Sequence, residues 1–278
     1  MNIQTALNNA YQRLVPVSGS ARLDAQLLLM EVLGINRAWL LSHDDEALTV
    51  ETAQRFEAYV LRAARGEPLP YILGRRAFYD LEFFVTPDVL IPRPETELLL
   101  EEALRFASTR QQLSGVDVGT GSGALAVTFA VHSAHTVYAL DISPAALAVA
   151  RRNAEKYNAN IHFFQGDLLQ PLIEYKVKID LMMANLPYIP SDELPALAVS
   201  QHEPLLALDG GADGLDLVRR LLRQVPSVCN SRARLLLEIG AWQGAAAKQA
   251  AQDILQPLEC DVLSDYAGHD RILRITMP

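Results

Sequence analysis

Short apolar runs alternate with helical patterns from residue 113 to residue 239, and this alternation restricts the fold more than any other feature of the chain. Ser143 and Pro144 are typical of an N-cap and a first helical residue, and they predict a helix through about residue 153. Residues 213–225 predict another helix. Because such alternation is typical of parallel βαβ units, the sequence predicts an α/β domain with a mostly parallel sheet. The runs expected to form its parallel strands are 115–118, 136–140, 161–164, 179–184 and 235–239.

The C-terminal tail follows a different pattern. Residues 258–263 and 271–275 are two further strand candidates, separated only by a polar turn that contains glycine. Strands joined this closely pair antiparallel. We therefore expect a seven-stranded sheet, mostly parallel with an antiparallel C-terminal strand, in a Rossmann-like domain that spans residues 93–278.

The N-terminal part of the chain differs from this domain. Residues 1–75 predict a small helical domain, in which Phe56, Val60 and Ala63 fall on one face of a helix. Gly66 then favours the end of that helix.

A β-hairpin linker is predicted over residues 76–92. The segment 78–85 is rich in aromatic and β-branched residues, and Thr86-Pro87-Asp88 supplies turn chemistry before the apolar residues 89–91. After the linker, the acidic and then apolar run 95–104 indicates the start of a helix.

Composition excludes several classes of protein. The 24 Lys and Arg residues against 33 Asp and Glu residues give a net charge of −9, which disfavours a broad surface for nucleic-acid phosphates. Cys229 and Cys260 are too few for a disulfide framework or a zinc cluster, and the histidines show no metal-ligand spacing. No run approaches the ~18 apolar residues that span a bilayer. We expect a soluble cytoplasmic protein without a bound metal.

A glycine loop follows the first strand of the predicted sheet. Its residues are Gly119, Thr120, Gly121, Ser122 and Gly123. Glycines at the carboxyl end of a strand let a ligand approach the backbone closely, and Asp141 after the next strand could accept hydrogen bonds from a ribose. Asp167 and Leu168 follow the third strand, where the carboxylate could bind an adenine amino group and the leucine could cover the ring. These features indicate an adenosine-containing ligand.

The loop does not identify that ligand. Gly119, Gly121 and Ala124 also fit the G-x-G-x-x-A pattern of nicotinamide enzymes, and a tight strand-helix turn without any cofactor has the same residues. From the glycine loop alone, these alternatives stay open.

The turn Asn185-Leu186-Pro187-Tyr188 ends the strongly apolar strand 179–184. The side-chain oxygen of Asn185 and the carbonyl of Leu186 are two acceptors suited to an NH2 group, and Pro187 restricts residue 186 to extended backbone. The ring of Tyr188 could lie flat against the planar group that carries this nitrogen. Such a site would hold a weakly nucleophilic nitrogen close to an electrophilic methyl group. A proline-terminated strand in which Asn185 only caps its own turn is the structural alternative.

Six segments together resemble the HemK/PrmC family of protein-(glutamine) methyltransferases, which modify peptide chain release factors. The resemblance covers nearly the whole chain and rests on residues 66–74, 91–97, 119–123, 185–188, 203–204 and 210–215. It implies a helical domain that helps to dock the release factor and a Rossmann-like domain that binds S-adenosylmethionine and releases S-adenosylhomocysteine. The methyl acceptor would be the glutamine side-chain amide of the Gly-Gly-Gln loop. The partner would be a release factor, not a nucleic acid or a membrane, and the enzyme would act as a monomer.

The resemblance also implies roles for individual residues. The glycine loop, including Ser122, would hold the methionine end of the cofactor, Asp141 the ribose, and Asp167 with Leu168 the adenine. Asn185, Leu186, Pro187 and Tyr188 would bind the glutamine amide, with Asn185 and Tyr188 catalytic and Asn185 also next to the cofactor. The residues expected to border the cofactor pocket are Arg93, Thr96 and Glu97.

Leu186 departs from the usual family turn, Asn-Pro-Pro-Tyr. The carbonyl acceptor survives, but the ring that fixes φ is lost, so we expect weaker pre-organisation of the turn.

Three other functions are alternatives to the one that the family resemblance implies. They are an adenine methyltransferase acting on nucleic acid, a nicotinamide-dependent oxidoreductase and an inactive binding module.

Overall fold

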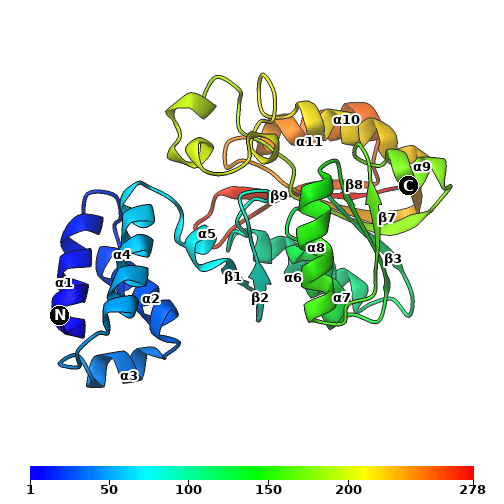
Figure 1. Ribbon diagram of the computed structural model, residues 1–278. Coiled ribbons are helices and arrows are strands. Elements are labelled where there is room, and N and C mark those ends of the chain that lie inside the picture. Colours follow the sequence, from blue (N-terminus) through cyan, green and yellow to red (C-terminus); the bar gives the residue numbers. More distant parts are fainter. The chain divides into compact units, whose positions relative to one another are not determined.

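The structure of the protein is a computed structural model that describes residues 1–278. The chain divides into two compact units, Met1–Arg75 and Arg76–Pro278 (Figure 1). None of its helices combines the length and the apolar character that crossing a bilayer requires.

The first unit is helical. Asn2, Asn36 and Thr49 begin helices, because the side-chain oxygen of each accepts a hydrogen bond from a backbone N–H three residues further on. Phe56 and Val60 are buried against the other helices of this unit, as their spacing predicts. The helices are α1 (Ile3–Leu14), α2 (Ala21–Leu33), α3 (Arg37–Ser42), α4 (Val50–Ala64) and α5 (Leu69–Leu73).

The second unit is built on a seven-stranded sheet of order β5-β4-β3-β6-β7-β9-β8. Strands β3 to β7 pair in parallel, whereas β9 pairs antiparallel with both β7 and β8. The predicted fold class is therefore confirmed. The strands are β3 (Ser114–Val118), β4 (Thr136–Asp141), β5 (Ile161–Gln165), β6 (Ile179–Ala184), β7 (Cys229–Glu238), β8 (Glu259–Ser264) and β9 (Asp270–Thr276).

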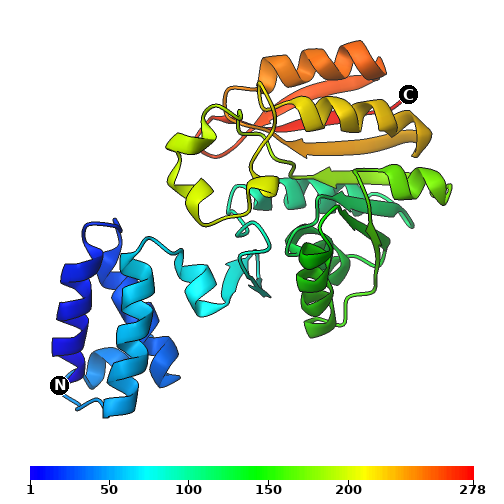
Figure 2. The same cartoon turned by 45° about the horizontal axis from the view of Figure 1, so that its top comes forward.

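Helices cover both faces of this sheet (Figures 1 and 2). One layer holds α6 (Thr96–Ala107), α7 (Ala124–His132) and α8 (Pro144–Lys156), and the other holds α9 (Gln170–Glu174), α10 (Asp216–Gln224) and α11 (Gly244–Leu255). Along β6, Met182 faces one apolar cluster and Met183 the other. Because both faces are buried, the central strands are largely apolar on both sides.

Strand β7 begins earlier in the chain than its apolar run predicts. The run starts at residue 235, but the strand starts at Cys229. Its first half is polar and largely exposed, with Arg232 at a φ of +58°. The apolar pattern therefore detects only the buried half of the strand.

The predicted hairpin is present, but its turn is in a different place. The strands are β1 (Arg75–Phe78) and β2 (Leu81–Phe84), so that the turn lies at residues 79–80 and not at 86–88. Thr86 and Val89 do close a turn by a backbone hydrogen bond, but residues 89–91 form no strand.

Asn153 on α8 and Tyr157 directly after this helix occupy backbone groups of β2 that a further neighbouring strand would need. The hydroxyl of Tyr157 bonds to the N–H and C=O of Glu82, and the carboxamide of Asn153 bonds to the N–H and C=O of Phe84 at 2.8 and 2.9 Å. These partners are about 70 residues away in sequence. A local pattern of strand and turn residues cannot reveal such partners.

Asn153 also holds the glycine loop, because its Nδ2 donates to the carbonyl of Ser122 at 2.9 Å. We predict that Asn153→Leu lowers the free energy of unfolding by about 3 kcal/mol, since buried backbone groups of Phe84 and Ser122 would lose their partners. Urea unfolding followed by circular dichroism measures this change. The exposed Asn160 provides a control, and Asn160→Ala should cost less than about 0.5 kcal/mol. Equal losses in the two variants would contradict a stabilising role of Asn153.

Candidate functional site

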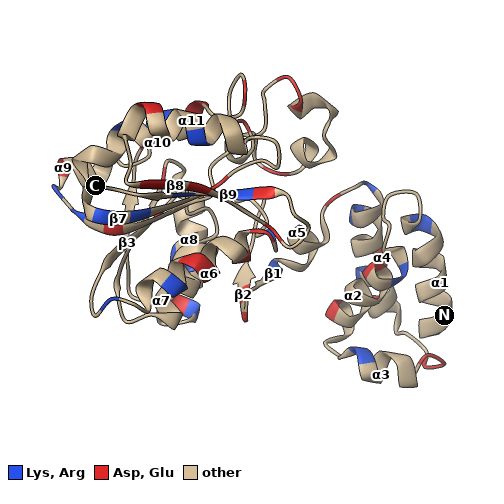
Figure 3. Ribbon diagram, turned by 180° about the vertical axis from the view of Figure 1, so that it is seen from behind, with Lys and Arg blue, Asp and Glu red and all other residues tan.

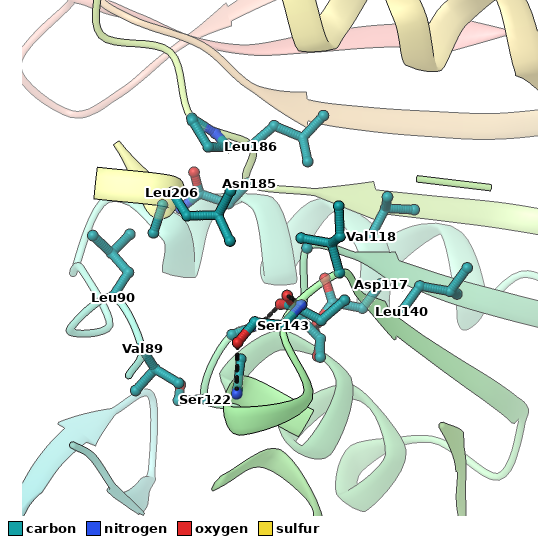
Figure 4. A pocket seen from close by; sticks show the side chains of 18 of the residues that line it. Val89, Leu90, Asp117, Val118, Ser122, Leu140, Ser143, Asn185, Leu186 and Leu206 are labelled. Atoms are coloured by element: carbon teal, nitrogen blue, oxygen red, sulfur yellow. Dashed lines mark hydrogen bonds between the residues drawn. The ribbon is translucent and has the colours of Figure 1, made fainter. Parts of the chain in front are cut away.

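A cavity of about 390 Å³ opens at the carboxyl ends of β3, β4 and β6 (Figure 4). The chain builds the sheet outward from β3 through β4 to β5, and then returns to add β6 on the other side of β3. The sheet therefore has a topological switch point between β3 and β6. The connections that follow these two strands run in opposite directions, and a crevice forms between them. The position and the size of the cavity are typical of a small-molecule site.

The glycine loop between β3 and α7 forms one wall of this cavity. Gly119 has a φ of +75°, and a Cβ atom there would lie 3.1 Å from Cδ2 of Leu186. Gly123 has a φ of +81°, and a Cβ atom there would lie 3.1 Å from Cβ of Ala150 on α8. These two positions therefore require glycine, because of both the backbone conformation and the close neighbours.

Asp141 at the end of β4 fastens this loop. Its two carboxylate oxygens accept hydrogen bonds from the backbone N–H groups of Gly121 and Ser143, each at 2.9 Å. Burial raises the pKa of Asp141, and the two backbone donors partly oppose the shift. The carboxylate borders the cavity and keeps lone pairs for a further donor.

Asp117 in β3 is a buried carboxylate with one unpaired oxygen. Its Oδ2 accepts from the hydroxyl of Thr120 at 2.7 Å and from the N–H of Ala126 at 3.2 Å, whereas Oδ1 has no partner. Burial raises the pKa of Asp117 to about 7. Since the residue lines the cavity, the unpaired oxygen indicates a ligand that brings a hydrogen-bond donor or a positive charge.

Asn185 at the end of β6 belongs to a chain of hydrogen bonds. Its Nδ2 donates to Oγ1 of Thr96 at 3.0 Å, and the Thr96 hydroxyl donates to Oε2 of Glu238 at 2.7 Å. Thr96 begins α6 and Glu238 ends β7, so the chain joins three elements. Burial raises the pKa of Glu238 to about 7. Oδ1 of Asn185 has no hydrogen-bond donor within the protein and remains an acceptor at the cavity.

Most residues that the sequence singled out line this cavity. They are Arg93, Thr96, Gly119, Thr120, Gly121, Ser122, Asp141, Asp167, Leu168, Asn185, Leu186 and Pro187.

Three of the residues that the sequence singled out do not line it. Gly123 instead caps α7. Glu97 faces the hairpin and accepts from the N–H of Tyr79 at 2.9 Å. Tyr188 is mostly buried, with its hydroxyl 3.5 Å from Oε1 of Glu238, and burial raises its pKa to about 12.

Two ion pairs border the cavity. Asp167 pairs with Arg220 of α10. Arg93 pairs with the buried Glu203 at 2.5 Å, and the other oxygen of Glu203 accepts from the N–H of Ile91 at 3.0 Å. Glu203 therefore joins the segment before α6 to the long segment between β6 and α10.

Sequence reasoning did not assign a role to Asp117, Glu238 or Arg220. Asp117 and Glu238 share one signal that could have revealed them, because each is the only acid in a short apolar run, 115–118 for Asp117 and 235–239 for Glu238. A charge at such a position is buried and needs a partner or a ligand. Arg220 carries no comparable signal, since it lies among other arginines on a helix.

Comparisons with known proteins agree with this fold and cavity. A family model described as "Methyltransferase domain" matches residues 116–206, and one described as "PrmC N-terminal domain" matches residues 5–74. A methyltransferase from Pyrococcus furiosus has a TM-score of 0.55 at 17% identity, covering 79% of this chain and 96% of that one. The 16S rRNA N2 G1207 methyltransferase of T. thermophilus, solved with AdoMet and guanosine, has a TM-score of 0.55 at 14% identity, covering 73% and 50%. The fold and the matched family model are together those of a methyltransferase domain.

Relatives in sequence are more specific. The release factor glutamine methyltransferase of Bacillus subtilis is 43% identical, covering 90% of this chain and 89% of that protein. The protein of the same name from Moorella thermoacetica is 42% identical, covering 98% and 97%. The chain belongs to the release factor glutamine methyltransferase family.

We predict that Asp117→Asn stabilises the ligand-free protein near neutral pH. The pKa of Asp117 rises from 3.8 to about 7 on folding, so between these values the folded protein holds a proton that the unfolded chain has lost. The free energy of unfolding therefore falls as pH rises through this window, and the loss persists above it. Asparagine cannot ionise and should lack this fall.

Thermal unfolding of both proteins between about pH 4 and pH 8 tests this prediction. The Tm difference in favour of the variant should grow up to about pH 7 and then stay constant. A difference that does not depend on pH would contradict ionisation of a buried Asp117.

Proposed function

We propose that this protein methylates the side-chain amide nitrogen of the glutamine in the Gly-Gly-Gln loop of peptide chain release factors, with S-adenosylmethionine as methyl donor. The observation that carries the proposal is the free Oδ1 of Asn185, at the same cavity as the glycine loop. Membership of the release factor glutamine methyltransferase family supports the same substrate.

The residues around the cavity fit the proposed cofactor. S-adenosylmethionine supplies a methyl group on a positively charged sulfur. The unpaired Oδ1 of Asp117 would accept from its ammonium group, and Asp141 would accept from the ribose hydroxyls. Asp167 and Leu168 would bind the adenine, with Arg220 holding the Asp167 carboxylate. Gly119 and Gly121 would allow the close approach of the cofactor to the backbone.

The proposed chemistry at the acceptor is direct transfer. The lone pair of an amide nitrogen is delocalised and makes the nitrogen a weak nucleophile. Oδ1 of Asn185 and the carbonyl of Leu186 would accept both N–H bonds of the glutamine amide, which orients its nitrogen toward the methyl group. The same acceptors would stabilise the positive charge that develops on nitrogen as its bond to the methyl group forms and the methyl–sulfur bond breaks, and the nitrogen would then lose one of its two protons to water. No covalent intermediate with the protein is required.

The role of Tyr188 changes in this proposal. Its hydroxyl lies near Glu238 and its carbonyl accepts from Nε2 of Gln243 at 2.9 Å, so it would support the turn from outside the cavity wall. We propose a positioning role for Tyr188 in place of the flat contact with the amide.

We propose that the helical unit Met1–Arg75 contributes to recognition of the release factor. The support is its match to the PrmC N-terminal domain, together with relatives of one name along nearly the whole chain. Residues 76–92 would act as the linker, and residues 93–278 as the catalytic domain of a monomeric enzyme.

The charges around the cavity argue against a nucleic-acid acceptor. The segment between β6 and α10 contains no Lys or Arg (Figure 3). Its acidic residues are Asp192, Glu193, Glu203, Asp209 and Asp213. Nucleic-acid enzymes of this chemistry need cations along the phosphates next to the flipped base. This segment offers no cation to that backbone.

One experiment tests the proposed function directly. Purified protein is incubated with isotope-labelled S-adenosylmethionine and an unmodified release factor, and the label is located by peptide mass spectrometry. We expect one added methyl group on the glutamine of the Gly-Gly-Gln peptide. Label on another residue, or transfer only to DNA or RNA supplied in parallel, would overturn the proposal.

We predict opposite defects in Asn185→Ala and Asp141→Ala. The first should lower kcat by at least about a hundredfold with little change in the Kd for S-adenosylhomocysteine, because it removes an acceptor for the glutamine amide. The second should raise that Kd at least about tenfold, because it removes the ribose partner and loosens the glycine loop. Calorimetric titration and initial rates separate the two. Parallel losses of binding and turnover in both variants would refute these roles.

We predict that Leu186→Pro keeps or raises turnover but lowers stability. Proline restricts φ at the turn and should improve its pre-organisation. The side chain of Leu186 is buried in an apolar cluster, however, and its loss should lower the free energy of unfolding by about 1–2 kcal/mol. Rates and urea unfolding measure the two effects. A large fall in kcat for the folded variant would contradict the argument from pre-organisation.

A further inference from the structure

The hydrogen-bond chain from Asn185 to Glu238 has a direction. A threonine hydroxyl has one proton, and Thr96 donates it to Oε2 of Glu238. Oγ1 of Thr96 can therefore only accept from Asn185. The carboxamide must turn its Nδ2 toward Thr96, and its Oδ1 is then the atom left at the cavity.

The reverse arrangement would defeat the proposed reaction. If Thr96 donated to Asn185 instead, the carboxamide would turn by half a rotation and present Nδ2 to the cavity. The glutamine amide would then meet an N–H donor where it needs an acceptor. The two orientations have the same shape and differ only in polarity, so apolar packing cannot select between them.

From this geometry we infer that Glu238 is a positioning residue, whose buried carboxylate acts through Thr96 to hold Oδ1 of Asn185 toward the acceptor amide. This inference rests on the proposed function. Glu238 does not touch the cavity, and its effect passes through one hydroxyl. It is suited to this task because an ionised carboxylate is only an acceptor.

The surroundings of Glu238 define when it is ionised. Burial raises the pKa of Glu238 to about 7, and Glu95 adds to this shift. The hydroxyls of Thr96 and Tyr188 and the guanidinium of Arg271 on β9 oppose it by favouring the carboxylate. The raised pKa of Tyr188 keeps its hydroxyl a donor at neutral pH. Below pH 7 a protonated Glu238 can itself donate to Thr96, which permits the reversed chain. Turnover should therefore fall as pH falls through about 7.

Variants at both ends of the chain test the inference. Thr96→Val keeps the shape but removes the hydroxyl, and kcat should fall at least about tenfold while the Kd for S-adenosylhomocysteine changes less than about twofold. Thr96→Ser restores a hydroxyl and should recover most of that loss. Glu238→Gln cannot ionise, so kcat with both substrates saturating should lose its decline below about pH 7. Glu101→Gln, at a partly buried position of α6 outside the cavity lining, is the control and should keep the wild-type pH profile.

A spectroscopic measurement makes the test independent of the methyl acceptor. The side-chain NH2 resonances of Asn185, identified by their absence from Asn185→Ala, report the hydrogen bond to Thr96. They should shift with pH through about 7 in the wild-type protein and not in Glu238→Gln. In Thr96→Val, the chemical shifts of these resonances should move to those of an asparagine side chain without this hydrogen bond.

The possible outcomes separate the two hypotheses. If release factor is methylated but the acidic decline persists in Glu238→Gln, or Thr96→Val keeps full kcat, the inference is wrong and the proposed function stands. If no release factor is methylated, the proposed function fails. In that case, resonances of Asn185 that respond neither to Thr96→Val nor to pH overturn the hydrogen-bond chain as well.

Discussion

The reversal of connection direction between β3 and β6 is the constraint on which the rest of this structure depends. Parallel strands all end at one edge of the sheet, and helices must return from there to the opposite edge. At most positions these connections cover the strand ends. Where the direction reverses, the strand ends stay uncovered, and the glycine loop, Asp141 and Asn185 all lie at this uncovered edge. The topology therefore brings together residues that are far apart along the chain.

Buried polar groups give this edge its chemistry. A carboxylate in an apolar strand costs free energy unless it is paired, and Asp117 and Glu238 meet that requirement in different ways. Glu238 is paired with hydroxyls of the protein, whereas Asp117 keeps one oxygen without a partner. The first arrangement fixes geometry within the protein. The second leaves an interaction that a ligand with a hydrogen-bond donor can complete, so that binding would relieve a cost carried by the free protein.

The sequence predicts the sheet well because its signals are local. The apolar runs of β3, β4 and β6 follow from burial on both faces, and the close spacing of β8 and β9 follows from chain length alone. The hairpin turn could not be located in this way, since the partners of β2 are Asn153 and Tyr157 on a helix much later in the chain.

The residues of the candidate site divide in the same way, into those with a local sequence signal and those whose partners are far away in sequence. The glycine loop and the Asn185 turn carry strong local signals, and both lie at the cavity. The sequence gives no means of deciding where the Tyr188 ring points, because that depends on the contact of its hydroxyl with Glu238 at the end of β7. The direction of the Asn185 carboxamide is likewise fixed by Thr96 on α6 and Glu238 on β7. The sequence motif around Asn185 therefore does not reveal it.

Glu203 has a consequence for how this enzyme class diversifies. One carboxylate binds both Arg93 and the backbone of Ile91, and so ties together two cavity-lining segments about 110 residues apart. If either segment changed its length or course, these bonds would break and the buried carboxylate of Glu203 would lose its partners. An exchange of one segment between relatives, made to alter the choice of acceptor, would therefore fail unless the other segment is exchanged with it. For the same reason, the two segments should be inherited together.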